Sequence, residues 1–144
     1  MTKKDDFDLQ NFLPYLLNQA AEESSLAFQN IYKDRYGMLR TEWRVLFHLG
    51  IYGRLTAKEI CERSKMRKTK ISRAVARLEE RRFLTRERDE ADRRLEYLEL
   101  TSAGRAAYTE LRGVAIDYDA ELAATFSSED VTVLRKLLHH LAKL

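Results

Sequence analysis

The chain has few of the residues that build turn-rich or disulfide-bonded folds. Its 144 residues include one cysteine, one proline and five glycines. A single cysteine excludes a disulfide framework within the chain and every zinc module that needs several cysteines. So few glycines and prolines disfavour a β-sandwich or a barrel, because the many tight turns of such folds need these residues. The composition therefore predicts a mainly helical protein.

Long apolar runs are absent as well. No stretch of about 18 consecutive apolar residues occurs, so we expect no membrane-spanning helix and no membrane partner. The polar start, Met1 to Asp6, lacks the apolar segment of a signal peptide. Hydrophobic residues still make up 44% of the chain, which is enough for a core. We expect a soluble, cytoplasmic protein with one domain and added oligomerisation elements.

Positive charge is concentrated in the middle of the chain. Residues 54–94 hold 15 Lys and Arg against 8 Asp and Glu, whereas the whole chain has a net charge of only +3. A basic segment between mildly acidic flanks is typical of a nucleic-acid-binding element carried on another scaffold. Charge alone fits equally well a solvated surface on which basic residues cluster by chance.

Hydrophobic periodicity predicts a long helix near the start of the chain and shorter helices behind it. The first helix should hold Pro14 in its first turn and end near Gly37, and the second is expected from residue 40 to 50 or 52. Thr56 and Glu59 form a capping-box pattern, which predicts a short third helix from residue 57 to about 64. A fourth helix is expected over 68–82, with an apolar stripe made by Ile71, Ala74, Val75 and Leu78.

The period changes after the fourth helix. Residues 83–88 and 95–101 are β-compatible and are joined by a charged loop, a pattern that predicts a hairpin. Two further helices follow, and the last should begin after Ser127. The apolar seam expected on the first of them consists of Tyr108, Leu111, Ala115, Tyr118 and Leu122. The side chains that the last helix is expected to bury are Leu134, Leu137, Leu138 and Leu141.

A short helix, a turn, a longer helix and a hairpin follow one another in the order of a winged helix-turn-helix. The predicted fold is mainly α with a small β-hairpin, in which N- and C-terminal dimerisation helices flank this winged part. We divide the chain into an N-terminal dimerisation helix (1–37), a winged helix-turn-helix DNA-binding domain (38–101) and C-terminal dimerisation helices (102–144). One small domain cannot bury all the apolar stripes of the flanking helices, so we expect a homodimer.

The fourth helix presents a face suited to DNA. With Ile71 set inward, the opposite face is small, hydroxyl-bearing or cationic for three turns, and acids come only in the last turn. Such N-terminal turns meet base edges in the major groove. No good N-cap side chain stands at 66–68, so the first N–H groups of this helix are free. They lie among cationic side chains, and a DNA phosphate would accept their hydrogen bonds. An ordinary solvated face is the alternative. The candidate DNA-binding residues here are Arg67, Lys68, Thr69, Lys70, Ser72, Arg73 and Arg77.

The loop of the predicted hairpin supplies three more candidate DNA-binding residues. Arg93 and Arg94 project from a loop that is too short to pack, and an arginine so placed can enter a narrow minor groove. Asp92 is expected to hold Arg94 in place as an ion pair. A solvent-exposed run of charges is the alternative.

The sequence resembles the MarR family of bacterial and archaeal transcription regulators, over nearly the whole chain. The resemblance implies an obligate homodimer on a pseudo-palindromic operator, with Thr69 and Arg73 at base-reading positions and Arg94 as the wing arginine. It also implies release from DNA by a small aromatic or amphipathic ligand bound between the dimerisation and DNA-binding regions. The segments that carry it are Thr41 to Leu46, Ile71 to Arg73, Leu78 to Glu80, Arg86, Asp92 to Arg94 and Leu100 to Gly104.

The chain departs from the family pattern at several positions. Leu39 stands where the family often has a capping Thr, and Arg82 where a Gly often ends the recognition helix. Oxidation-sensing members carry a reactive Cys in the first helix, whereas Cys61 lies at an inward position of the short third helix and reads as a core residue. His48 is far in sequence from His139 and His140, which do not face each other, so we expect no metal site.

These observations predict a sequence-specific DNA-binding transcription regulator, a ligand-responsive repressor that binds as a dimer. A winged-helix protein-interaction module and a weakly specific nucleoid-type binder are the alternatives. Trp43, Phe47 and His48 fit either a ligand pocket or plain core. No phosphate loop, paired-His zinc helix or nucleophile elbow occurs, so we expect neither an enzyme nor a cofactor.

Overall fold

The computed structural model describes residues 4–144, and in this range the chain forms six α-helices and three short strands. The polar start that lacks the pattern of a signal peptide falls partly outside the described residues, which do not include Met1, Thr2 and Lys3. The elements are the 3₁₀ turn η1 (Leu9–Asn11), α1 (Leu13–Tyr36), α2 (Arg40–Tyr52), β1 (Leu55–Thr56), α3 (Ala57–Ser64), α4 (Lys68–Glu80), β2 (Leu84–Arg88), β3 (Glu96–Leu100), α5 (Ser102–Ala123) and α6 (Ser128–Ala142).

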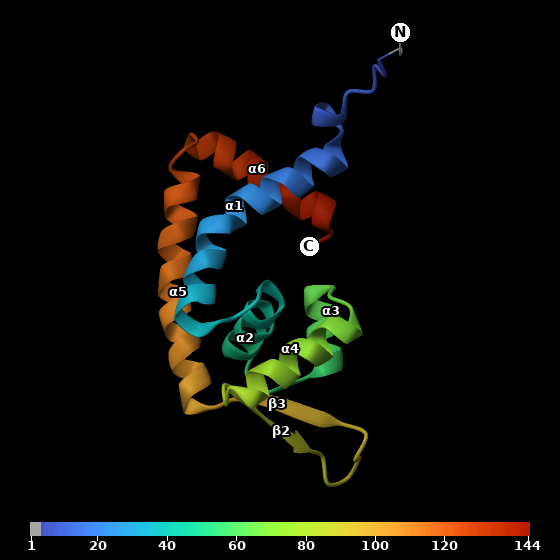
Figure 1. Cartoon of the computed structure of the whole chain (residues 1–144), viewed down its shortest axis with the longest axis vertical. Coiled ribbons are helices and arrows are strands. Elements are labelled where there is room, and N and C mark those ends of the chain that lie inside the picture. The colour runs from blue at the N-terminus through green and yellow to red at the C-terminus, as the bar shows by residue number, and fades with distance from the viewer. Residues whose placement is uncertain (1–3) are drawn as a thin grey trace.

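The helices fall into two ends of an elongated molecule (Figure 1). At one end, α2, α3 and α4 pack together above the β2–β3 hairpin, and at the other end α1 and α6 cross. Helix α5 runs along one side and joins the two ends. The fold is therefore a winged helix-turn-helix with flanking helices, as predicted. None of the helices described is long and apolar enough to cross a membrane.

Local signals in the sequence set most of the helix boundaries. Thr56 and Glu59 make both hydrogen bonds of the capping box that begins α3. Pro14 lies in the first turn of α1, where its missing N–H leaves no helical bond unmade. After α4, Arg82 adopts a left-handed backbone with φ of 64°, at the position where the family often has Gly. These three features agree with the sequence analysis.

The sheet contains one strand that the sequence analysis did not predict. Residues 55 and 56 form β1, which pairs antiparallel with β3, so that the strand order is β1-β3-β2. The hairpin register pairs Leu84 with Leu100 and Arg88 with Glu96. A two-residue strand carries no alternation of its own, so only its partner reveals it. Through β1 the sheet closes over the start of α3.

The core of the winged end is closed within one chain. Helix α4 buries the predicted stripe of Ile71, Ala74, Val75 and Leu78. It packs on α2, whose buried face includes Val45, Leu46 and Leu49. The buried face of α2 also includes Glu42, a charged residue that the analysis of the pattern did not place in the core.

The prediction that α6 buries its leucines is wrong for the single chain. Leu134, Leu137, Leu138 and Leu141 are between 41% and 54% exposed, and no residue of α6 is buried. The physical reason is that α6 lies beside α1 across an open groove of about 550 Å³, with no further element on its apolar side. Leu122, at the end of the expected α5 seam, is exposed for the same reason. The side chains lining the groove include Leu17, Ala20, Phe126, Val131, Leu134 and Leu138.

Candidate nucleic-acid interface

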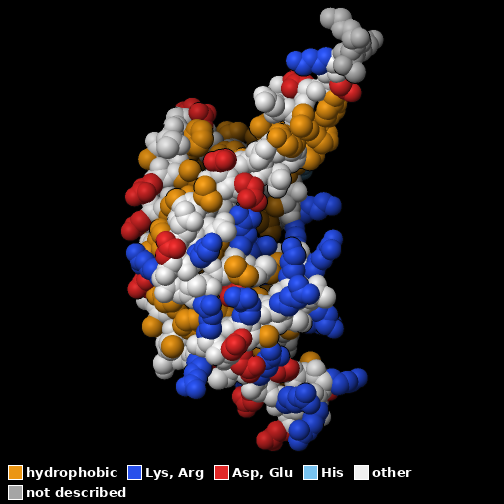
Figure 2. Space-filling view, in the orientation of Figure 1, with side chains coloured by type: hydrophobic (Ala, Val, Ile, Leu, Met, Phe, Trp, Pro, Cys, Tyr) orange, Lys and Arg blue, Asp and Glu red, His pale blue; other side chains and the backbone are white. Residues whose placement is uncertain are grey.

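Helix α4 begins without a side-chain cap and without an acid in its first turn. Arg67 is the N-cap residue, and its side chain accepts no hydrogen bond from the helix. The first N–H groups of a helix lack partners within the helix and carry partial positive charge, so they attract anions. The exposed residues around this open end include Arg67, Lys68, Thr69, Lys70, Ser72 and Arg73. Figure 2 shows Lys and Arg side chains gathered over α3, α4 and the hairpin.

We call β2, β3 and the loop 89–95 between them the wing. At its tip the expected ion pair is present, because Nε and Nη2 of Arg94 lie 3.1 and 3.3 Å from Oδ1 and Oδ2 of Asp92. The backbone N–H of Arg94 also donates to Asp92 Oδ1 at 3.1 Å. These hydrogen bonds from Arg94 hold the pKa of the Asp92 carboxyl below its usual range. The Arg94 side chain is 92% exposed, so the carboxylate orients it without covering it.

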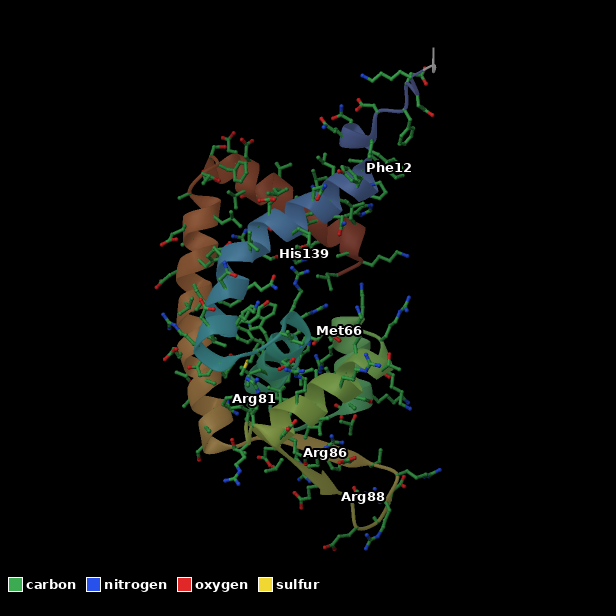
Figure 3. The ribbon with its side chains drawn as sticks, in the orientation of Figure 1. Phe12, Met66, Arg81, Arg86, Arg88 and His139 are labelled. Atoms are coloured by element: carbon green, nitrogen blue, oxygen red, sulfur yellow. The ribbon has the colours of Figure 1, made fainter. Side chains whose placement is uncertain are left out.

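The rest of the wing carries further cations. Arg93 is exposed beside Arg94, and Arg86 and Arg88 lie along β2 (Figure 3). Arg86 forms ion pairs with Glu79 of α4 and Glu96 of β3, at 3.0 and 3.6 Å. The wing is therefore joined to α4 through Arg86, which leaves Arg93 and Arg94 at the outer end.

Arg77 differs from the other candidate DNA-binding residues of α4. Its Nε lies 3.3 Å from Oε2 of Glu42, a carboxylate that is 0% exposed. The Arg77 side chain itself is 48% exposed. The sequence analysis missed Glu42, although its spacing from Val45, Leu46 and Leu49 puts it on the buried face of α2. Helical periodicity alone was the signal that could have found it.

A second side chain of α2 fixes the end of α3. Nη2 of Arg44 donates to the carbonyl oxygen of Ser64 at 2.8 Å. The hydroxyl of Ser64 in turn donates to the carbonyl oxygen of Ile60 and accepts from the N–H of Met66. Burial, and then the nearby charge of Arg40, lower the pKa of Arg44. Helix α2 thus makes polar contacts with both helices of the helix-turn-helix, through Glu42 and through Arg44.

A pocket of about 270 Å³ lies between α1, α2 and α5. Of the three predicted pocket residues, only Trp43 lines it. Phe47 packs behind Trp43 at a ring-centroid distance of 5.1 Å, and Nδ1 of His48 lies 2.6 Å from the carbonyl oxygen of Arg44, away from the pocket. The pocket's two arginines and its α1 and α5 side chains were not predicted from the sequence. The full lining is Ser24, Ser25, Phe28, Tyr32, Arg40, Trp43, Arg44 and Tyr118.

The described residues hold no group of three or more His, Cys, Asp or Glu side chains placed to bind a metal ion. Cys61, expected to face inward, is partly buried on α3.

Comparison with known proteins finds similarity to one family. A sequence model of the MarR family matches residues 36–95, from the end of α1 to the end of the wing loop. Over this segment the chain is similar to the MarR family, and the curated relatives that it matches are HTH-type transcriptional regulators. The HTH-type transcriptional regulator YwoH of Bacillus subtilis is 28% identical over 118 residues, which cover 81% of this chain and 85% of that relative.

Solved structures share the fold of this chain over almost its whole length. A mutant MarR of E. coli in complex with operator DNA superposes with a TM-score of 0.83 at 20% identity, covering 96% of this chain and 99% of that one. BpsR of Bordetella bronchiseptica, whose DNA binding is regulated by 6-hydroxynicotinic acid, superposes with a TM-score of 0.86 at 20% identity. That match covers 97% of this chain and 99% of BpsR.

Proposed function

We propose that this regulator binds a pseudo-palindromic operator sequence-specifically, as a homodimer, and represses transcription until a small ligand releases it. The observation that carries the proposal is the open, cationic start of α4. A helix N-terminus without a cap or an acid, surrounded by exposed Arg67, Lys68 and Lys70, suits a DNA phosphate. An acid or a side-chain cap at this point would oppose such contact.

The exposed face of α4 suggests how contacts divide between bases and backbone. Thr69 and Arg73 lie on the face opposite the buried stripe, where a helix in the major groove meets base edges. An arginine there can form a bidentate pair with guanine. Ser72 lies on the same exposed side, while Lys68 stands at the helix entrance, where phosphates pass. Arg94, oriented by Asp92, suits a narrow minor groove.

The unpartnered helices support the homodimer. Helix α6 has no buried residue and α1 exposes Leu13 and Leu16, which leaves a broad apolar surface at one end of the chain. Monomeric proteins rarely expose patches of this kind. A second copy would cover the patch through a two-fold interface and bring two α4 helices to the same side, as a palindromic site requires.

The pocket between α1, α2 and α5 supports a ligand response. Its lining combines aromatic rings, among them Phe28 and Trp43, with the guanidinium groups of Arg40 and Arg44. This chemistry fits a small aromatic or amphipathic molecule that carries an acidic group. Arg44 also donates to the end of α3, so a ligand that drew its guanidinium into the pocket would loosen that contact. The regulation of BpsR by a small aromatic acid is a precedent within the same fold.

The test starts with selection of binding sites from random duplexes, followed by anisotropy titrations with the selected duplex and a scrambled one at 50–200 mM salt. We expect a palindromic site and steeply salt-dependent affinity. Arg73→Ala should abolish the preference for the selected duplex, with a loss of about 1–3 kcal/mol of discrimination, because it removes a base contact. The matched variant Lys68→Ala should weaken binding to both duplexes equally.

Two outcomes would contradict the proposal. Equal affinity of the wild type for both duplexes would favour a nucleoid-type binder, and no DNA binding would favour a protein-interaction module. Equal loss on both duplexes in Arg73→Ala would contradict the base-reading role.

A further inference from the structure

The carboxylate of Glu42 is an uncommon feature of the winged core. The side chain is 0% exposed, and neither of its oxygens accepts a hydrogen bond from the described residues. Its ion-pair partner is Arg77, whose Nε lies 3.3 Å from Oε2. A buried charge is unfavourable unless an opposite charge lies close to it. The fold therefore keeps Arg77 against Glu42 rather than free in solvent.

This ion pair joins the start of α2 to the C-terminal part of α4. Glu42 lies in the first turn of α2, and Arg77 lies near the end of α4. The same end of α4 makes a second contact, because Nη1 of Arg81, the C-cap residue, donates to the carbonyl oxygen of Tyr36 at the end of α1. Figure 3 shows Arg81 at this end of α4, next to α1 and α2. The N-terminal turns of α4 lie beyond these two contacts, and their buried side, with Ile71 and Ala74, packs in the winged core.

A small tilt of α4 about its C-terminal end displaces its N-terminal end by a larger distance. Lys68 and Arg77 are nine residues apart, about 13 Å along a helix that rises 1.5 Å per residue. A tilt of about 5° at Arg77 displaces the first turn by roughly 1 Å. Hydrogen bonds to bases tolerate a donor–acceptor range of only about 0.5 Å. The orientation of α4 at Arg77, together with the packing of its buried stripe, therefore affects whether Thr69 and Arg73 reach base edges.

We propose that Glu42 is a positioning residue for DNA recognition, and that Arg77 acts through Glu42 instead of contacting DNA. The ion pair sets the tilt of α4, so sequence preference depends on a carboxylate that no DNA atom touches. The proposal rests on the proposed function and changes one of its details, since Arg77 leaves the set of DNA contacts. The Arg77 side chain is 48% exposed, and its Nε lies against the Glu42 carboxylate.

The two members of the pair should respond unequally to substitution. Arg77→Met leaves a buried carboxylate without a counter-charge, whereas Glu42→Gln leaves an arginine that can turn to solvent. We expect the ratio of affinities for selected and scrambled duplex to fall roughly tenfold or more in Arg77→Met, and less in Glu42→Gln. The double variant Glu42→Gln with Arg77→Met removes both charges and should regain most of the ratio.

The experiment measures this ratio and the salt slope for the wild type, both single variants and the double variant. Glu80→Gln is the matched control, because it removes an exposed acid from the last turn of α4, and it should leave the ratio within about twofold. Arg77→Lys keeps the charge and should retain more of the ratio than Arg77→Met. The salt slope should stay at the wild-type value in every variant of Arg77.

Four results would overturn the proposal, and they differ from one another. A slope lowered by about one in Arg77→Met and in the double variant, with no recovery of the ratio, would make Arg77 a phosphate contact. A wild-type ratio kept in both single variants would refute the positioning role alone. A wild type without any preference would refute the proposed function, and the positioning role with it. Urea unfolding of the same four proteins without DNA measures the coupling of the pair, and zero coupling would also refute it.

Discussion

The two ends of the molecule differ in how completely one chain buries them. In the winged end, α2 and α4 each bury four residues, and polar contacts from Arg44 and Glu42 fix α3 and α4. At the other end α6 buries none, and α1 buries only Phe28 and Tyr32, both in its second half. The core of the winged end is complete within one chain, whereas the crossing helices leave apolar side chains exposed. Under the proposed function, the first end recognises DNA and the second end assembles the dimer.

The largest expected effect is a change of oligomeric state, caused by charged substitutions in α6. Leu134→Glu combined with Leu137→Glu places two acids per chain on the apolar surface of α6. Burial of a leucine contributes about 1.5–3 kcal/mol, and a two-fold interface counts each change twice, so we expect a monomer at micromolar concentration. Sedimentation velocity measures the mass.

The control for this variant is Lys136→Glu, which changes the charge of α6 without removing a leucine and should leave the dimer intact. A wild type that sediments as a monomer would contradict the assignment of this end to dimerisation. Circular dichroism should show that the double variant keeps its helices, because the winged core does not include α6.

Two glycines of α5 allow the packing at the winged end to be compared with the packing further along the same helix. A Cβ on Gly104, at the winged end, would lie 1.9 Å from the carbonyl oxygen of Phe83, whereas one on Gly113 meets nothing within 4 Å. Gly104→Ala should therefore destabilise the protein by about 1–3 kcal/mol or more. Gly113→Ala should stabilise it by about 0.5–1 kcal/mol, because alanine is the better helix former. Urea unfolding checks both, and equal effects would contradict the difference in packing.

The wing should affect DNA binding with little effect on stability. Arg94→Ala should lower the affinity for the selected duplex and reduce the salt slope by about one, because one phosphate-neutralising cation is lost. The melting temperature should change little, since the pair with Asp92 is exposed. Asp92→Ala should give a weaker loss in the same direction, although it removes a negative charge. Tighter binding of Asp92→Ala to all DNA would make net charge the governing factor.

The smallest expected effect is on the titration of Asp92. Hydrogen bonds from Arg94 lower the pKa of this carboxyl, so the pair is fully formed above the ordinary pKa of an aspartate. Its contribution is lost only as the pH falls through the lowered pKa of the folded protein. A carboxyl ¹³C titration should show this pKa rising towards the ordinary value in Arg94→Ala and staying low in Arg93→Ala. An unchanged pKa in Arg94→Ala would refute the orienting contact.

Local patterns predicted the winged end well. The stripe of α4, the capping box at Thr56 and the missing cap at Arg67 all depend on residues a few positions apart, and the structure has them as expected. The ion pair of Asp92 with Arg94 is equally local. Each of these features follows from rules that act within one or two turns of chain.

Features that depend on distant segments were harder to predict. The pocket draws on three helices, so Arg40 and Arg44 carried no signal of their own, and β1 exists only through its pairing with β3. The leucines of α6 showed the right apolar period, but a period cannot say which chain covers a face. The burial of Glu42 could have been predicted only by giving its position on the apolar face of α2 more weight than its charge.

The central claim is that one chain completes the winged end while two chains complete the DNA-binding unit. Sedimentation equilibrium of the protein at about 1 μM, alone and with one equivalent of selected duplex per two chains, tests it most directly. We predict twice the mass of the chain in free solution and two chains on each duplex at low salt, with the scrambled duplex left free at about 200 mM salt. A single chain that binds the selected duplex with full preference would contradict the claim.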